Sequence, residues 1–212
     1  MANWVEVEQI VQRHSSLTDT SPYMSSFVQV RGSIPFFWSQ IPNPLTVQPD
    51  IVFDKNIDPN AVATRKHFAR MFQKYSYPIF CLNLTKANKQ REETVASEYR
   101  SFINYTINKE LPEGLKIHML HYDVKMKQKK VKNFPYDLLE QVRRFIKQTG
   151  FFSCVPCQKL KYSDEQPNRT AYRGYSHVEI QRGVVRTNCI DSLDRTNFAQ
   201  EMIGYQTCLL QL

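Results

Sequence analysis

The chain has 212 residues, with 28 lysines and arginines against 20 aspartates and glutamates, and carries a formal net charge of +8. A chain of this length buries roughly 70% of the surface that its unfolded form exposes, so we expect one domain whose core needs no disulfides. The five cysteines are odd in number and irregularly spaced, and no apolar run approaches the ~20 residues of a membrane-spanning helix, so we expect reduced thiols and a soluble protein.

In chain order, the first pattern is "NWVEVEQIVQRH", whose mixture of apolar and polar residues predicts a helix. Runs rich in β-branched and aromatic residues predict the strands, which are residues 25–38, 50–54, 77–85, 115–124 and 177–188, the last of which runs into a loop. Helical periodicity predicts the helices, which are residues 58–76, 90–111, 134–150 and a segment from Arg195 onward. Alternating strands and helices favour an α/β layered fold, with a mixed β-sheet flanked by helices.

Local signals mark the ends of several helices. Asp58 is expected as an N-cap with Pro59 in the first turn, and Gly150 is expected to close the helix of residues 134–150. In the last helix, apolar side chains recur at steps of three and four, which predicts a face packed on the core. They are Phe198, Met202, Tyr205, Leu209 and Leu212. This helix has no stop signal, so we expect a piece of a longer protein.

A polar loop separates the last predicted strand from the last predicted helix, in the sequence "GVVRTNCIDSLDRTNFAQEMIGYQ". A strand–loop–helix turn directs backbone N–H groups and the positive end of a helix dipole into one concavity, which suits an anion such as phosphate. The thiol of Cys189 lies in this loop, and its pKa is expected to fall well below the ordinary value. Arg195 can hold two phosphate oxygens with its planar guanidinium. A single cysteine is otherwise more often a small buried hydrophobic residue.

Longer segments of the chain resemble the Sac-domain phosphoinositide phosphatases. "RTNCIDSLDRTN" is similar to the family's catalytic loop, R-x-N-C-x-D-C-L-D-R-T-N. "ANWVEVEQIV", "SSFVQVRGSIPFFWSQ" and "KHFARMFQKYSYPIFCLNL" resemble further family segments, so the resemblance covers Asn3 to Gln200, and the endosomal polyphosphoinositide phosphatases look closest. The resemblance implies that residues 1–212 are the catalytic portion of a Sac phosphatase domain, without the N-terminal subdomain that precedes these segments in the family.

The resemblance also implies covalent catalysis by the loop. Cys189 matches the nucleophile, which attacks the phosphorus of an inositol-ring phosphate to give a cysteinyl-phosphate, and Arg195 matches the phosphate clamp. No metal or other cofactor is expected, since the loop amides and Arg195 balance the phosphoryl charge. Asp191 is the first candidate for the general acid. Asp123 and Asp194 are alternatives, although Asp194 also fits an N-cap.

The other loop residues are expected to line the substrate site. They are Asn188, Ile190, Ser192, Leu193, Asp194 and Thr196. Outside the loop, Arg31 is either a second phosphate contact or part of a structural salt bridge, and Lys125 is a further candidate for substrate binding. The chain departs from the family pattern at Ser192, which replaces a second loop cysteine. It departs again at Val124 and Lys125, which replace the Phe and His after Asp123 and so weaken the case for that carboxylate.

Three other patterns carry weaker signals. Cys154 and Cys157 have thioredoxin spacing but lack the flanking strand and helix, so no redox function is expected. His118 and His121 fall on opposite faces of a predicted strand, so no zinc site is expected. The lysine-rich run "KMKQKKVK" of residues 125–132 is either a solvated turn or a contact with anionic lipid headgroups.

We therefore expect a phosphatase that acts on the inositol ring of phosphoinositides at the cytosolic face of an endomembrane, such as that of the endosome, vacuole or lysosome. The first alternative is a phosphatase that acts on phosphotyrosine or on soluble inositol phosphates. The second is a catalytically silent Sac scaffold that binds phosphoinositide or a regulatory protein. The net charge of +8 suits polyanions in general, but nucleic acid is not expected as a partner.

Overall fold

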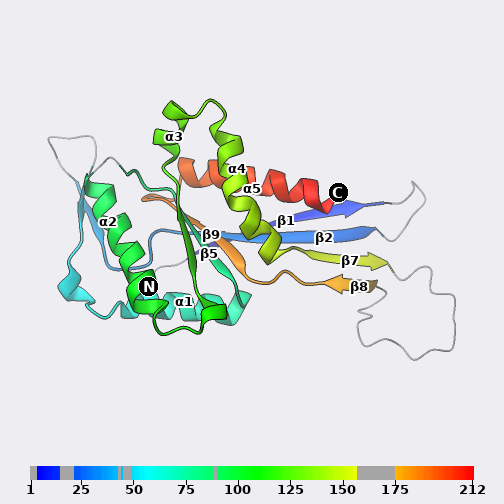
Figure 1. Ribbon diagram of the computed structural model, residues 1–212, viewed down its shortest axis with the longest axis horizontal. Coiled ribbons are helices and arrows are strands. Elements are labelled where there is room, and N and C mark those ends of the chain that lie inside the picture. The colour runs from blue at the N-terminus through cyan, green and yellow to red at the C-terminus, as the bar shows by residue number, and fades with distance from the viewer. Residues whose placement is uncertain (1–3, 15–21, 43, 45–48, 88–89, 157–174) are drawn as a thin grey trace.

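The structure is a computed structural model that describes residues 4–14, 22–42, 44, 49–87, 90–156 and 175–212. The strands of the main sheet are β1 (Val5–Arg13), β2 (Tyr23–Arg31), β5 (Ile79–Asn83), β6 (His118–His121), β7 (Phe152–Pro156), β8 (Tyr175–Glu179) and β9 (Val184–Asn188). Their order is β6-β5-β9-β2-β7-β8, and β1 also pairs with β2 (Figure 1). Two further strands, β3 (Ser39–Ile41) and β4 (Asp50–Val52), pair with each other in a small separate sheet.

The middle of the main sheet is parallel and its other pairings are antiparallel. Strands β6, β5, β9 and β2 run in one direction, whereas β1, β7 and β8 form antiparallel pairs. Every residue of β5 and β9 is buried, as expected for parallel strands with both faces covered. The carboxyl ends of the four parallel strands therefore meet at one edge of the sheet, which is where open α/β sheets form their binding crevices.

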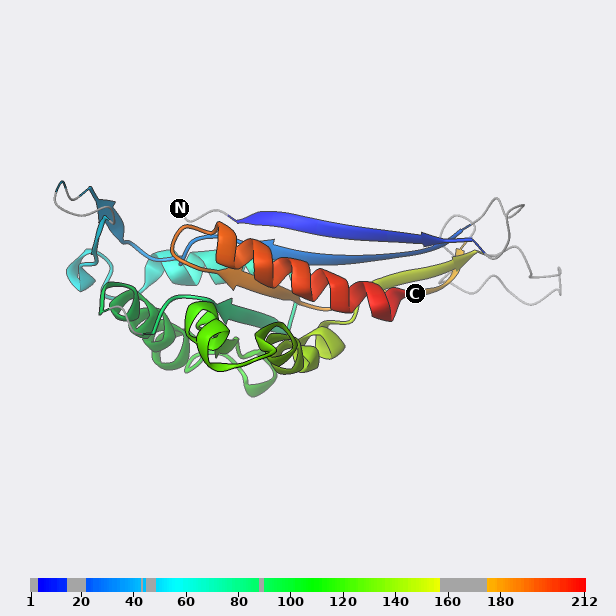
Figure 2. The ribbon, with the colours of Figure 1, turned by 90° about the horizontal axis from the view of Figure 1, so that it is seen from above.

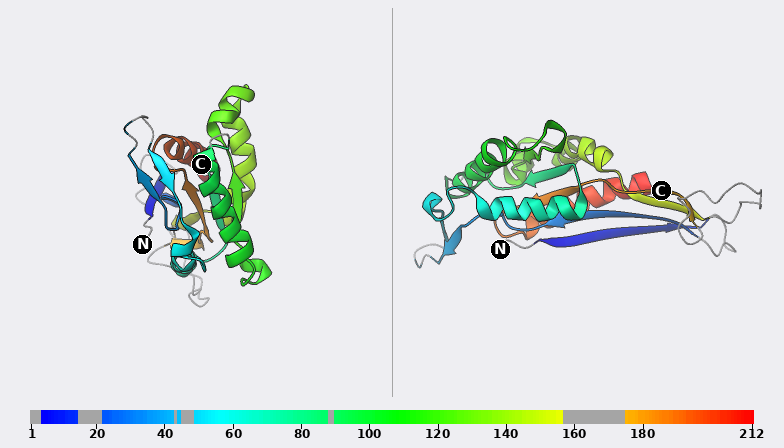
Figure 3. Two further views of the ribbon diagram at one scale, coloured as in Figure 1. Left: turned by 90° about the vertical axis from the view of Figure 1, so that its left-hand side faces the viewer. Right: turned by 90° about the horizontal axis from the view of Figure 1, so that it is seen from below.

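Helices cover both faces of this sheet. They are α1 (Val62–Tyr75), α2 (Gln90–Ser101), α3 (Val124–Lys130), α4 (Phe134–Thr149) and α5 (Asp194–Gln211), with short helical turns at Lys55–Ile57, Phe102–Ile107 and Glu113–Leu115. Alternate residues of β5 divide the core: Phe80 and Leu82 pack with α4 and α5, while Ile79 and Cys81 pack with α1 and α2. Viewed from above, α5 lies in front of the sheet (Figure 2), and viewed from below, α1 does (Figure 3).

This architecture confirms the predicted mixed α/β class, and most predicted elements occur. Gly150 ends α4 with a φ of +61°, a conformation that favours glycine. Asp58 caps α1, since its carboxylate accepts hydrogen bonds from the N–H groups of Val62 and Ala63, but the helix begins later than predicted and Ala61 holds the N-cap position. Residues 177–188 contain parts of two strands, β8 and β9, where one was predicted.

The prediction of an N-terminal helix is wrong, because residues 5–13 form strand β1. Val5 and Val7 alternate with Glu6 and Glu8, which is the period of a strand. All nine residues of β1 pair with β2, from Val5 opposite Arg31 to the other end of the strand. The pairing with β2 therefore stabilises the extended conformation of these residues. A prediction from helical periodicity over a few residues takes no account of such long-range pairing.

The predicted buried face of α5 is only partly correct. Phe198 and Met202 pack against the core, but Tyr205, Leu209 and Leu212 are 59%, 53% and 62% exposed. The buried residues of the helix are Ile203 and five small or polar residues, namely Thr196, Ala199, Gln200, Gly204 and Thr207. A Cβ at Gly204 would lie 2.9 Å from the side-chain oxygen of Gln9, so the small residues let the helix approach the sheet closely. No helix in the described residues is long and apolar enough to span a bilayer.

Candidate active site

The candidate site lies where the parallel strands end. Leu84, directly after β5, donates its N–H to the carbonyl of Asn188 at the end of β9, at 2.8 Å. Gly32, directly after β2, donates to the carbonyl of Thr187 on β9, at 3.3 Å. The loop of residues 189–193 leaves β9 at this edge and leads into α5. The structure therefore brings the ends of β2, β5 and β9 around the predicted loop.

Two hydrogen bonds hold the thiol of Cys189, which is fully buried. The thiol donates to Oδ1 of Asp191 at 3.0 Å, and it accepts a hydrogen bond from the hydroxyl of Thr196 at 3.2 Å. The same Asp191 oxygen accepts the N–H of Leu193 at 3.1 Å, in a tight turn whose residue Ser192 has a φ of +55°. The loop thus places a carboxylate and a hydroxyl directly on the sulfur.

The predicted low pKa of Cys189 is wrong for this structure. Burial raises the pKa of the thiol, and the Asp191 carboxylate raises it further, which outweighs the lowering by Thr196 and Arg195. Burial also raises the pKa of Asp191, but its hydrogen bonds from Cys189 and Leu193 and the charge of Arg195 bring that pKa below its ordinary value. At neutral pH the pair is therefore a neutral thiol beside a carboxylate. The sequence argument counted the loop amides but not burial or the adjacent acid.

Arg195 lies in the first turn of α5 and is held by residues after β5. Its Nη1 donates to the carbonyl of Leu84 at 3.0 Å and to Oε2 of Glu92 at 2.7 Å. The same Glu92 oxygen accepts the N–H of Lys86 at 2.8 Å, and the Lys86 ammonium lies 3.5 Å from its other oxygen. Burial alone lowers the pKa of Arg195, but Glu92 outweighs it and the pKa is raised, so the guanidinium stays charged.

Arg31 reaches the loop from the end of β2. Its guanidinium donates to the carbonyl oxygens of Ser192 and Leu193 and to the side-chain oxygen of Asn197. These are neutral acceptors, so this contact is not the structural salt bridge that the sequence suggested. The geometry therefore gives Arg31 the role of fixing these two loop carbonyls. In each of these peptide units the N–H points away from the carbonyl, and so away from Arg31.

A buried polar network lies behind the loop. Arg186 is fully buried and donates to a ring nitrogen of His67, to the side-chain oxygen of Asn188 and to the carbonyl of Ser33. Asn188 in turn donates to the side-chain oxygen of Asn83 at 2.8 Å. The side chain of Asn188, predicted to bind substrate, therefore serves to lock β9 to β5 and to the buried arginine.

The remaining predicted loop residues differ in their surroundings. Ile190 is buried in the core cluster under α1 and α2. Leu193 and Asp194 are exposed, and Asp194 is the first residue of α5 rather than its N-cap, so the predicted capping role is wrong. The hydroxyl oxygen of Ser192 is buried and has no hydrogen-bond partner among the described residues. The hydroxyl of Ser192 therefore has unused hydrogen-bonding capacity.

Asp123 and Lys125 lie at the start of α3, outside the loop. The carboxylate of Asp123 is buried and caps α3 by accepting the N–H of Met126 at 3.0 Å. Its other oxygen accepts the N–H of Ala87 at 2.8 Å, so both oxygens have structural roles. Lys125 is exposed, in a run that forms a helix rather than the predicted turn. Lys127 in the same run pairs with Asp137 at 2.9 Å.

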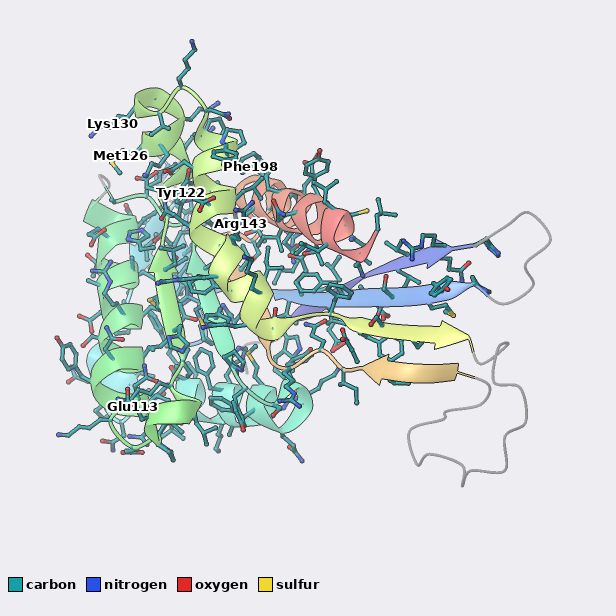
Figure 4. The ribbon with its side chains drawn as sticks, turned by 45° about the vertical axis from the view of Figure 1, so that its right-hand side comes forward. Glu113, Tyr122, Met126, Lys130, Arg143 and Phe198 are labelled. Carbon is teal, nitrogen blue, oxygen red and sulfur yellow. The ribbon has the colours of Figure 1, made fainter. Side chains whose placement is uncertain are left out.

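The region around α3 packs on the start of α5. The hydroxyl of Tyr122 donates to the carbonyl of Phe134 at 2.9 Å, and the ring of Phe134 lies 5.2 Å from the ring of Phe198. Figure 4 shows Tyr122, Met126 and Phe198 on the side where α3, α4 and α5 meet. The lysines of α3 thus belong to the same end of the molecule as the loop.

Among the described residues, no three His, Cys, Asp or Glu side chains are placed together as metal ligands. His118 stacks on Phe80, with ring centroids 5.0 Å apart, while His121 contacts Thr85 and Arg100. Cys154 is buried on β7, and Cys157 lies outside the described residues.

Comparison with known proteins identifies the family. Residues 1–129 match the model of the SacI homology domain, which is more than half of the chain. The chain belongs to the SacI homology domain family. Over its whole length it is 37% identical to "Phosphoinositide phosphatase SAC4" of Arabidopsis thaliana and to "Polyphosphoinositide phosphatase" of Schizosaccharomyces pombe. Over 96% of its length it is 30% identical to "Phosphatidylinositol-3-phosphatase SAC1" of Arabidopsis thaliana. The chain spans only 30%, 24% and 27% of these relatives.

Sequence reasoning missed two residues of this SacI homology chain near Arg195: Glu92, which contacts it, and Lys86, which contacts Glu92. Both follow β5, the strand beside β9 in the sheet. A signal was present, since side chains that follow neighbouring parallel strands meet at one edge. Using it requires the strand order, which the sequence alone leaves open.

Proposed function

We propose that this chain, residues 1–212, is the catalytic portion of a phosphoinositide phosphatase that hydrolyses a phosphomonoester on the inositol ring. The observation that carries the proposal is the arrangement of Cys189 at the carboxyl end of β9 with Arg195 in the first turn of α5. The names of the relatives support a phosphoinositide as the substrate. The loop residues 188–196 would surround the transferred phosphate, with Arg195 as its clamp.

In the first step, the thiol proton passes to Asp191, which already accepts its hydrogen bond at 3.0 Å. The thiolate sulfur attacks phosphorus, the bond from phosphorus to the inositol oxygen breaks, and that oxygen leaves with the electron pair. Asp191 donates the proton to this oxygen, so a residue that is ionised in the free protein acts as the general acid. The charge of Arg195 lowers the pKa of Cys189 and so stabilises the thiolate while the proton is on Asp191.

In the second step, water attacks the phosphorus of the cysteinyl-phosphate and the phosphorus–sulfur bond breaks. Asp191, now ionised, takes a proton from the water, and inorganic phosphate leaves. The hydroxyl of Thr196, which donates to the sulfur at 3.2 Å, stabilises the sulfur anion as it departs. In both steps every bond that breaks is matched by one that forms, and the loop groups and one water molecule supply and accept all the protons.

A lipid substrate would bring the chain to a membrane, at the cytosolic face of an endosome, vacuole or lysosome. The exposed lysines of α3 would contribute attraction to anionic headgroups, at ~1 kcal/mol per basic residue near the surface. Lys125 is the first of them after the end of β6. A regulatory or scaffold protein remains a proposed partner without a surface assigned to it.

Two competing functions make different predictions for one experiment. A phosphatase for phosphotyrosine or soluble inositol phosphates would release phosphate from those substrates at rates equal to or above those for phosphoinositides. A silent Sac scaffold would bind phosphoinositide without releasing phosphate. The Cys189–Asp191 pair favours turnover over the scaffold, because a purely binding loop has no need of a thiol bonded to an acid.

The test is phosphate release from a panel of phosphoinositide isomers, with a phosphotyrosine peptide and a soluble inositol phosphate beside it. Cys189→Ser should abolish release and leave lipid binding nearly intact, since a serine hydroxyl accepts the same hydrogen bonds but is far less nucleophilic. Cys208→Ser, which changes the cysteine on α5, is the matched control and should keep wild-type rates. Equal release by wild type and Cys189→Ser would refute the cysteine mechanism.

A further inference from the structure

Glu92 is a buried carboxylate in the first turn of α2 that sequence motifs do not mark. It is 8% exposed and receives hydrogen bonds from both Arg195 and the N–H of Lys86. Burying a carboxylate costs several kcal/mol unless cations and donors compensate it. Here the compensating partners are Lys86 and the guanidinium that the proposed mechanism uses, and the guanidinium makes the shorter ion pair, at 2.7 Å. The cost of burial is therefore tied in part to the position of Arg195.

The contacts of Arg195 are unequal around its guanidinium. Both of its hydrogen bonds, to Leu84 and to Glu92, are made by Nη1. Within the residues that the structure describes, Nε and Nη2 make none. A guanidinium offers two parallel N–H groups along its Nε–Nη2 edge, which match two oxygens of a phosphate. The protein thus holds one end of the group and leaves the phosphate-binding edge unoccupied.

Glu92 also connects this clamp to the strand that carries the nucleophile. It fixes the segment after β5 through the N–H of Lys86, and the carbonyl of Leu84 in that segment accepts from Arg195. The N–H of Leu84 bonds to the carbonyl of Asn188, the residue before Cys189. Glu92, Arg195 and the end of β9 are therefore one hydrogen-bonded unit.

We propose that Glu92 is a positioning residue that holds Nη1 of Arg195, so that the Nε–Nη2 edge faces the phosphate bound by the Cys189 loop. This inference rests on the proposed phosphatase function and extends it to a residue on α2. Without Glu92, the guanidinium retains only the carbonyl of Leu84 and its edge is free to turn. A misplacement of about 1 Å is enough to cost about 100-fold in rate.

The first experiment compares kinetics of the full chain. Glu92→Gln keeps the size of the side chain and removes its charge, and kcat/KM should fall about 100-fold. Glu110→Gln is the matched control, because it removes the carboxylate of another Arg–Glu pair, with Arg65, at an exposed site, and it should keep wild-type kinetics. If Glu92→Gln also keeps wild-type kinetics, the positioning role is overturned.

A double-mutant cycle separates positioning from general damage to the fold. If Glu92 acts through Arg195, then Glu92→Gln should lower the rate by less than about threefold in an Arg195→Lys background, because the two effects overlap. Additive losses would show a merely structural role and overturn the proposal. If Glu92→Gln does not fold, Glu92→Asp takes its place, because it keeps the charge on a side chain that is one methylene shorter. A wild-type rate in that variant would also overturn the proposal.

A measurement without turnover distinguishes failure of this inference from failure of the proposed function. NMR hydrogen exchange of the Arg195 Nη protons should be about tenfold faster in Glu92→Gln than in the wild type, since a hydrogen bond between charged groups is lost. Unchanged exchange would overturn the inference even in an active phosphatase. If exchange responds but no isomer of the panel releases phosphate, the contact is real and the proposed function fails.

Discussion

The hydrogen bond between Cys189 and Asp191 predicts how one substitution changes the chemistry of the thiol. Burial raises the pKa of Cys189, and the Asp191 carboxylate adds to this through its hydrogen bond at 3.0 Å and through its charge. Asp191→Asn keeps the size of the side chain and removes the charge. The thiolate should therefore form at lower pH in the variant than in the wild type.

The size of the effect follows from the type of hydrogen bond. A hydrogen bond to a charged group contributes about 1.5–3 kcal/mol. Asp191 is exposed, so solvent screening favours the lower limit. Since about 1.4 kcal/mol is a factor of ten in an equilibrium, we expect about ten times more thiolate in Asp191→Asn at about pH 8.

The assay is alkylation of Cys189 by iodoacetamide, followed by mass spectrometry over a range of pH. Only the thiolate reacts, so the rate at a given pH reports its population. Asp194→Asn is the control, because Asp194 is an exposed carboxylate of the same segment and the hydrogen bonds of the thiol go to Asp191 and Thr196. Alkylation rates that are equal in Asp191→Asn and the wild type would show that the carboxylate does not control the thiol, and the proposed proton route would be lost with it.

Two further sets of substitutions test the membrane contact and the fold. Replacing the exposed lysines of α3 by Gln should weaken binding to anionic vesicles and lower hydrolysis of vesicle-borne substrate, with a loss that shrinks as salt screens charges beyond about 10 Å at 0.1 M. These lysines are Lys125, Lys129 and Lys130. Hydrolysis of a short-chain soluble phosphoinositide should be unchanged, and equal losses on both substrates would mean that the run acts in the site or in folding. Gly183→Ala should lower the free energy of unfolding by about 3 kcal/mol in urea titrations. The reason is that Gly183 has a φ of +73° and its Cβ would lie 1.9 Å from the carbonyl oxygen of Pro78. Gly114→Ala, where the Cβ meets open space, is the control, and an equal effect of the two substitutions would contradict this account.

The sequence predicts the parts of this structure that local rules govern. The first four residues of β5 form a buried, continuous apolar run, and Gly150 marks the end of α4, so both are evident in a short window. Cys189 and Arg195 are six residues apart, so their placement on one loop and helix start follows from a single strand-to-helix turn. Their roles as nucleophile and phosphate clamp are predictions that the loop chemistry and the family resemblance both favour.

The parts that the sequence did not predict depend on residues far apart in the chain. Glu92 meets Arg195 across 103 positions, and Arg31 meets Ser192 across 161. Strand β1 is decided by its pairing with β2. The pKa of Cys189 depends on burial, which is a property of the whole fold. Apart from β1, whose Val–Glu alternation already has the period of a strand, the deciding energy is a tertiary contact that the local sequence does not contain.

The buried guanidinium of Arg186 supports an anionic ligand on grounds that do not depend on the cysteine. Its three hydrogen bonds go to a histidine nitrogen, an amide oxygen and a carbonyl, none of which carries a full negative charge. A buried cation with these neutral hydrogen-bond partners is costly, and this one lies directly behind the loop. Arg195 adds a second guanidinium with its Nε–Nη2 edge open. In the proposed function, the two arginines would contribute to anion binding and the Cys189–Asp191 pair would be needed for turnover. A substitution of the thiol should therefore separate binding from hydrolysis.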